Sequence, residues 1–75
     1  MINLNAVESS MIAAAGYEPD TKTLIVLFNS GVAYEYHDVP EEIYDQLMAA
    51  ESKGHFMNDN VIDRYPYARF RGWNT

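Results

Sequence analysis

The clearest pattern along the chain is a predicted strand over residues 22–28, which is almost wholly apolar from Thr23 to Phe28. A strand over this run would be apolar on both sides, because its alternate residues are Thr23, Ile25 and Leu27 on one side and Leu24, Val26 and Phe28 on the other. A strand with two apolar faces is typical of the middle of a sheet. We therefore expect this strand to be central.

The segments on either side of this run predict two further strands. Asn29–Gly31 supplies residues that tolerate positive φ, so residues 32–37 should return antiparallel as a hairpin partner. Val32, Tyr34 and Tyr36 would share one side of it, and the side with Glu35 and His37 is more polar. Before the run, residues 10–17 are small and apolar and end at a turn cluster, which favours a strand; an alanine-rich helix over residues 9–15 is the alternative.

Helical spacing follows the hairpin. Pro40 fits the first turn of a helix, with Asp38 or Val39 as its cap, and this helix should run to about residue 51. Its apolar side chains lie on one face, which should pack on the sheet: Ile43, Tyr44, Leu47, Met48 and Ala50. A second short helix, capped by Ser52, should run to about residue 62. Pro66 excludes a central strand, so we expect residues 64–71 to be an extended or edge segment.

These elements predict one α+β domain: an antiparallel three-stranded β-meander packed against an amphipathic helix, with a second short helix and an aromatic, arginine-bearing C-terminal segment. We place the domain at residues 9–71, with an N-terminal arm without secondary structure at 1–8 and a tail at 72–75. The chain has 75 residues and no cysteine. Its core must therefore stabilise the fold without disulfides or a thiolate metal site.

Charge is unevenly distributed within a net charge of −6. Residues 1–52 carry Lys22 against nine acids, which gives −8, and residues 53–75 carry four basic residues against Asp59 and Asp63, which gives +2. The apolar stretch Met11–Ala15 is too short for a signal segment or a membrane span. We expect a soluble, cytoplasmic protein without a membrane partner.

The stretch from Arg64 to Arg71 carries the most suggestive chemistry. Three arginines alternate with Tyr65, Tyr67 and Phe70, and single-stranded nucleic acid is bound by cations at its phosphates and by aromatic rings that stack on its bases. Tyr34 and Tyr36 could supply further stacking surfaces. Alternatively, the rings close the core and the arginines are solvated or pair with the acidic residues of the first helix, Glu41, Glu42 and Asp45.

Catalytic and metal sites find little support. His55 and Asp59 would share a helix face, and Glu35, His37 and Asp38 are clustered, but neither set has a convincing third ligand. Adjacent His37 and Asp38 on a strand would point to opposite faces, so they cannot form a triad with Ser9 or Ser10. We expect no enzyme activity, no cofactor, no metal and no small-molecule substrate.

Taken in order, these residues resemble the KTSC domain, a short family named for its place at the C-terminus of some lysyl-tRNA synthetases and also found as small bacterial and phage proteins. The resemblance covers residues 9–70. It lies in Ser9-Ser10 with Ile12, Gly16-Tyr17, Leu24-x-Val26-x-Phe28, Gly31, Tyr34-x-Tyr36, Val39-Pro40, Tyr44 with Leu47, Ala50-x-Ser52-x-Gly54, Asn58 and Tyr65-x-Tyr67. RNA binding is the function usually suggested for that family, so the resemblance implies it as an expectation for this chain. Ile62 and Asp63 depart from it, since they stand where the family often has a basic residue.

Two functions follow as hypotheses. The first is a nucleic-acid-binding module, for RNA above all, that uses Lys53, Arg64, Arg69 and Arg71 with Tyr34, Tyr36, Tyr65 and Tyr67. The second is a protein-binding regulator that docks on a larger nucleic-acid-processing enzyme, which the charge of −8 over residues 1–52 favours. A single continuous face of basic side chains and exposed rings would favour the first hypothesis.

Overall fold

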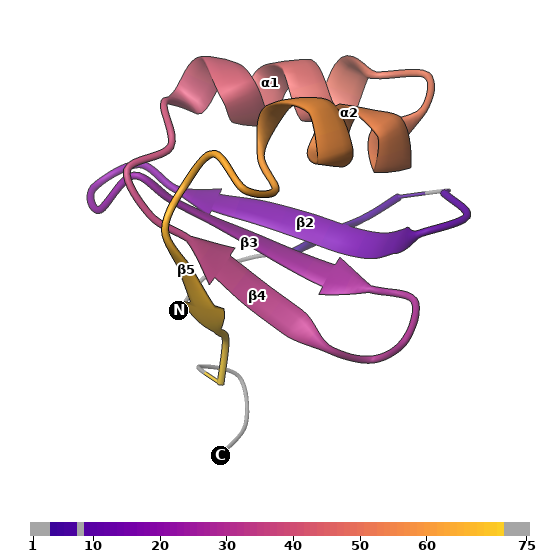
Figure 1. The fold of residues 1–75 in the computed structure, drawn as a ribbon, viewed down its shortest axis with the longest axis horizontal. Coiled ribbons are helices and arrows are strands. Elements are labelled where there is room, and N and C mark those ends of the chain that lie inside the picture. Colours follow the sequence, from indigo (N-terminus) through magenta and orange to yellow (C-terminus); the bar gives the residue numbers. More distant parts are fainter. Residues whose placement is uncertain (1–3, 8, 72–75) are drawn as a thin grey trace.

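Two helices cover one face of a five-stranded antiparallel sheet (Figure 1). The computed structural model describes residues 4–7 and 9–71. The strands follow one another across the sheet in chain order, β1-β2-β3-β4-β5. The elements are β1 (Asn5–Ala6), β2 (Ile12–Glu18), β3 (Thr23–Phe28), β4 (Ala33–Tyr36), α1 (Glu41–Ala49), α2 (Lys53–Asn60) and β5 (Tyr67–Arg69).

The α+β class is confirmed, and the three-stranded meander is wrong in its number of strands. Strands β2, β3 and β4 form the expected meander, and β1 and β5 extend it at its two edges. The N-terminal arm, for which no secondary structure was expected, therefore contains a strand, because Asn5 pairs with Ala15. That strand has only two residues, too few to show an alternating pattern. Residues 72–75 lie outside the described residues, and the domain boundaries stay a prediction.

Strand β2 settles the choice between strand and helix for the alanine-rich segment. Ala14 pairs with Leu27 and Ala15 with Val26, so the helix over residues 9–15 is wrong. Small side chains suit a strand here because β2 lies between β1 and β3 and is largely buried. At the other edge of the sheet, β5 follows Pro66 and pairs with β4 alone, as an edge strand should.

The turn between β3 and β4 needs the residue that the sequence puts there. Gly31 has φ +94°, in the region that side chains with a Cβ rarely adopt. Its N–H donates to the carbonyl of Phe28 over 2.9 Å, which closes the turn. The expected positive φ at this position is confirmed.

The two helix starts differ. Ser52 caps α2, and its Oγ accepts from the His55 N–H over 3.4 Å, as expected. The expected cap of α1 is wrong: Pro40 occupies the cap position without a side-chain hydrogen bond. Asp38 instead adopts φ +61° in the turn, and Val39 is buried in the core. Acidic Glu41 and Glu42 stand in the first turn of α1, where they favour the positive end of its dipole.

Register decides which residues meet the helices. Leu24 pairs with Tyr36, and Val26 with Tyr34, so these side chains share the face that α1 and α2 cover. Leu47 of α1 and Met57 of α2 are fully buried against that face. The resulting core consists of Ile12, Ala15, Leu24, Val26, Tyr36, Val39, Leu47, Met57 and Val61.

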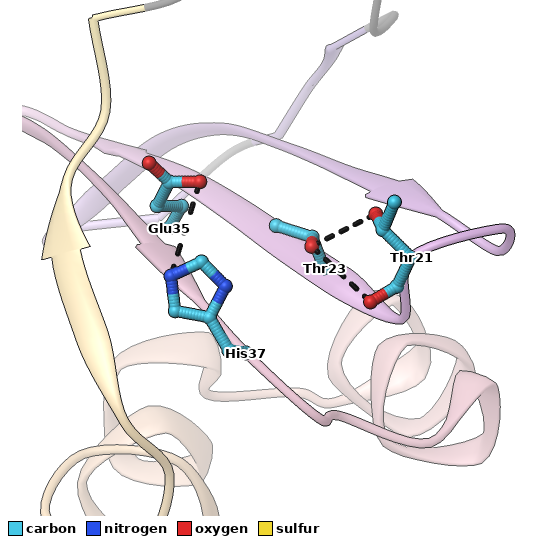
Figure 2. Close-up of polar contacts among 4 residues, drawn as sticks. All are labelled: Thr21, Thr23, Glu35 and His37. Carbon is cyan, nitrogen blue, oxygen red and sulfur yellow. Dashed lines mark hydrogen bonds and ion pairs between the residues drawn. The ribbon is translucent and has the colours of Figure 1, made fainter.

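Polar contacts mark the opposite face of the sheet (Figure 2). Glu35 pairs with Ile25 and therefore points away from the helices. Its Oε2 lies 4.0 Å from His37 Nε2, as Figure 2 shows. In the same view, the Thr21 hydroxyl donates to the Thr23 hydroxyl over 2.9 Å. The sequence expectation that the side with Glu35 and His37 is the wetter side of β4 agrees with this placement.

Candidate interaction cleft

A cleft of about 570 Å³ opens beside the turn that joins β3 and β4. Its residues come from three parts of the chain that are far apart in sequence, around residues 10–11, 28–36 and 62–67. They are Ser10 and Met11 before β2, Phe28, Asn29, Ser30 and Val32 around the turn, Tyr34 and Tyr36 of β4, and Ile62, Asp63 and Tyr67 after α2. The volume falls within the range of about 300–1,000 Å³ that is common for sites that hold small groups.

Aromatic rings form the main wall of the cleft. The ring centroids of Phe28 and Tyr34 lie 6.0 Å apart, and those of Tyr34 and Tyr67 lie 5.5 Å apart, both edge to face. Tyr36 and Tyr67 approach to 6.0 Å with tilted rings. Tyr67 remains 61% exposed although it touches two other rings. One member of a connected aromatic cluster is therefore available to a guest.

Asp63 gives this aromatic wall a negative charge. Among the described residues that line the cleft, it is the one with a formal charge at neutral pH. Its backbone has φ +68°, which aspartate tolerates better than most residues. Burial, followed by the charges of Tyr34, Tyr67 and Asp63, raises the pKa of Tyr36 to about 12. The Tyr36 phenol therefore keeps its proton, and its ability to donate a hydrogen bond, to a higher pH than an ordinary tyrosine.

The register brings four of the eight predicted site residues together. Tyr36 pairs with Tyr67, and Tyr34 with Arg69, so all four side chains lie on the same face of β4 and β5. Arg69 is exposed and does not line the cleft. Tyr36, with 4% exposure, belongs to the core as much as to the cleft.

The other four predicted residues have different surroundings. Lys53 Nζ donates to the Ala50 carbonyl over 2.9 Å, and Arg64 Nε donates to the Asp59 carbonyl over 2.7 Å. These two cations hydrogen-bond backbone carbonyls at the C-terminal ends of α1 and α2, where a positive charge is favourable. Tyr65 packs against the core, and Arg71 is exposed beyond β5. Half of the proposed nucleic-acid surface is thus engaged in the fold or separate from the rings.

Sequence reasoning missed several cleft residues. Met11 and Ile62 were assigned to a strand segment and a helix, and Asp63 was noticed only as a departure from the family pattern. Its position in the cleft depends on how α2 ends, where the Ile62 N–H donates to the Met57 carbonyl over 2.8 Å. No sequence signal marks such an ending, because it involves neither glycine nor proline.

The comparisons with known proteins agree with this architecture. The family model of the KTSC domain matches residues 8–65. The chain belongs to the KTSC family. A crystal structure of a KTSC domain protein from Yersinia pestis superposes with a TM-score of 0.90 at 30% identity, over 93% of this chain and 99% of that one.

The KTSC domain also occurs within larger proteins. A protein of Tsukamurella paurometabola is 47% identical over 62 residues, which cover 83% of this chain and 92% of that protein. A lysine–tRNA ligase of Nostoc sp. is 40% identical over 60 residues, which cover 80% of this chain but only 11% of the ligase. This kind of domain is therefore a small module that can stand largely alone or form a segment of an enzyme.

Ser9 and His37, two residues considered for a hydrolytic triad, have different polar partners in the structure of this KTSC domain. Ser9 Oγ accepts from the N–H groups of Met11 and Ile12, which ties it to the start of β2. His37 instead lies near Glu35. Within residues 4–7 and 9–71, no three His, Asp or Glu residues gather as metal ligands would, and no helix is both long and apolar enough to cross a membrane.

Proposed function

We propose that this KTSC domain is a non-catalytic docking module that binds a protein partner through the aromatic cleft. The observation that carries the proposal is the combination of a four-ring wall with a single carboxylate, Asp63. Partially exposed tyrosines are favoured at protein interfaces because they supply a large contact area with little loss of side-chain entropy. Tyr67, exposed yet held by two neighbouring rings, has this character.

Charge favours a protein over a polyanion. The chain carries −6, so at low salt it repels nucleic acid and attracts basic protein surfaces. Two of the four cations in its C-terminal part, Lys53 and Arg64, already bind backbone carbonyls. Arg69 and Arg71 are exposed, and they are the two cations that we consider as phosphate contacts below.

Selection from a displayed library of random heptapeptides would test the docking function. Peptides that bind the wild-type domain should bind Tyr67→Ala at least about tenfold more weakly, as expected when an aromatic anchor is truncated. Glu42→Ala, an exposed change on α1, is the control and should bind them like the wild type. A library that yields no binder, or binders that bind Tyr67→Ala as tightly as the wild type, would contradict this function for the cleft.

Single-stranded RNA binding is a second candidate, favoured by one specific observation. Tyr67 and Arg69 stand on the same face of β5, which puts a stacking ring beside a cation. Similarity to a segment of lysine–tRNA ligases also supports it. With Arg69 and Arg71 as the two phosphate contacts, log K against log salt should have a slope of about −1.4. The absence of binding to mixed-sequence RNA at about 20 mM salt, where screening is weak, would argue against it.

A further inference from the structure

We infer that the aromatic cleft selects a positively charged side chain, an arginine guanidinium, from a basic segment of the protein partner. This inference rests on the proposed docking function and names the chemistry of its guest. It combines three features of the described residues: the ring wall, the carboxylate of Asp63, and the position of Arg69 outside the cleft.

The ring wall provides the first part of cation recognition. A guanidinium or ammonium within about 6 Å of a ring centroid is attracted by the negative face of the ring. Here successive centroids in the series Phe28, Tyr34, Tyr67 and Tyr36 are 5.5–6.0 Å apart. The Tyr34 and Tyr67 rings are inclined at 78°, so a cation near both can lie over the face of one and beside the other.

The carboxylate provides the second part. Asp63 lines the cleft and is exposed, so it keeps its charge in contact with water. Because Asp63 and the four rings line the same cleft, its carboxylate and the rings face the same guest. A planar guanidinium can stack on an aromatic ring while its N–H groups bind a carboxylate. Because guanidinium is also less strongly hydrated than ammonium, arginine should bind better than lysine.

Arg69 distinguishes this guest from a nucleotide. It lies opposite Tyr34 on β5, next to the cleft but outside its lining. Its charge opposes a bound cation and attracts a phosphate. Replacing Arg69 with a neutral residue should therefore strengthen arginine binding and weaken RNA binding. Replacing Asp63 with a neutral residue should weaken arginine binding and strengthen RNA binding.

The test uses short blocked peptides, acetyl-Gly-Gly-X-Gly-Gly-amide, with X as arginine, lysine, citrulline or leucine, titrated into the whole chain and followed by NMR signals of Tyr34 and Tyr67. The RNA arm uses an oligouridylate pentamer. Citrulline has nearly the shape of arginine without its charge. The arginine peptide should bind about tenfold more tightly than the citrulline peptide.

Matched variants locate the interaction. Asp63→Asn should weaken arginine binding about fivefold, because asparagine keeps the shape and tolerates positive φ but lacks the charge. Asp45→Asn on α1 removes the same charge away from the cleft and should leave binding unchanged. Arg69→Gln should strengthen arginine binding about twofold, with Lys22→Gln, in the turn before β3, as its unchanged control.

The outcomes separate the two proposals. Equal binding of the arginine and citrulline peptides, or equal effects of Asp63→Asn and Asp45→Asn, would overturn the choice of a cation and leave the docking function standing. No binding by any of the peptides, together with failure of the heptapeptide selection, would overturn both. A third outcome would assign the cleft to RNA and overturn this inference. The NMR signals of the cleft would then shift with the oligouridylate but with none of the peptides, and Arg69→Gln would weaken oligouridylate binding.

Discussion

Two tyrosine pairs on the helix-covered side of the sheet, Tyr17 with Tyr44 and Tyr34 with Tyr67, have different surroundings. Tyr17 and Tyr44 stack with centroids 5.6 Å apart and rings inclined by 18°, where α1 packs on β2. Tyr34 and Tyr67 lie 5.5 Å apart at 78°, where the face opens into the cleft. The first pair is only partly exposed, whereas Tyr67 of the second is 61% exposed.

The difference between the pairs lies in what covers them and in their hydroxyl partners. The Tyr17 hydroxyl donates to the Val39 carbonyl, and the Tyr44 hydroxyl accepts from Asn5 Nδ2 over 3.1 Å. Together these bonds tie β2, the start of α1 and β1 to one another. Centroid distance and residue type do not distinguish the pairs. Helix cover and polar partners do, and Tyr67 of the second pair is the ring that they leave exposed.

The largest expected effect is on the covered side. Leu47→Ala should lower the free energy of unfolding by about 2–4 kcal/mol, because a fully buried leucine is truncated where its surroundings relax incompletely. Urea unfolding monitored by far-UV circular dichroism would measure it. Gln46→Ala, exposed near the middle of the same helix, is the control and should change stability by less than about 0.5 kcal/mol. Similar values for the two variants would mean that α1 does not pack as described.

Tyr36 connects the core to the cleft, and its titration should reveal that connection. The folded pKa of about 12 exceeds the ordinary value of 10.0, so the fold favours the protonated phenol. This contribution to stability is fully present below pH 10 and is lost as the pH rises through 12. Unfolding by urea at pH 9 and pH 11.5 should therefore show a greater loss for the wild type than for Tyr36→Phe. Equal losses would place the Tyr36 hydroxyl in water.

The order of elements from β2 to α2 could be predicted from the sequence because each is marked locally. A continuous apolar run marks β3, Gly31 marks the turn, and Ser52 marks the start of α2. Strand β1 escaped prediction because its two residues gain their structure only from pairing with β2. The expected cap of α1, Asp38 or Val39, is wrong because Val39 is buried in the core and Pro40 occupies the cap position.

The candidate site was only partly predictable for a different reason. Tyr34, Tyr36 and Tyr67 were selected by residue type, and alternation placed Tyr34 and Tyr36 on one face. Their contact with Tyr67 depends on the register between β4 and β5, which joins segments about 30 residues apart. The uses of Lys53 and Arg64 as partners of helix carbonyls depend on where each helix ends. No local sequence pattern indicates the β4–β5 register or the residues at which the two helices end.

The turn beside the cleft should show an intermediate effect. Gly31→Val should cost about 1–2 kcal/mol because a β-branched residue is strained at φ +94°. An added Cβ would meet no atom within 4 Å, so the cost comes from the backbone and not from a clash. Ser30→Ala in the same turn is the control, and thermal unfolding would compare the two. Equal melting temperatures would exclude the described turn geometry.

The smallest expected effect tests the comparison of the tyrosine pairs most directly. Tyr17→Phe should lower the free energy of unfolding by about 1 kcal/mol, because it deletes the donor to the Val39 carbonyl and leaves a part-buried acceptor without it. Tyr67→Phe removes the same atom from a ring that is 61% exposed, where water serves the hydroxyl in both the folded and the unfolded chain. Its effect on stability should be close to zero. Both variants keep their rings, so packing cancels in the comparison, and urea unfolding of the two side by side isolates the hydroxyl. If Tyr67→Phe proved as destabilising as Tyr17→Phe, the Tyr67 hydroxyl would have to be a structural partner. The cleft pair would then belong to the framework of the domain and not to a surface kept for binding.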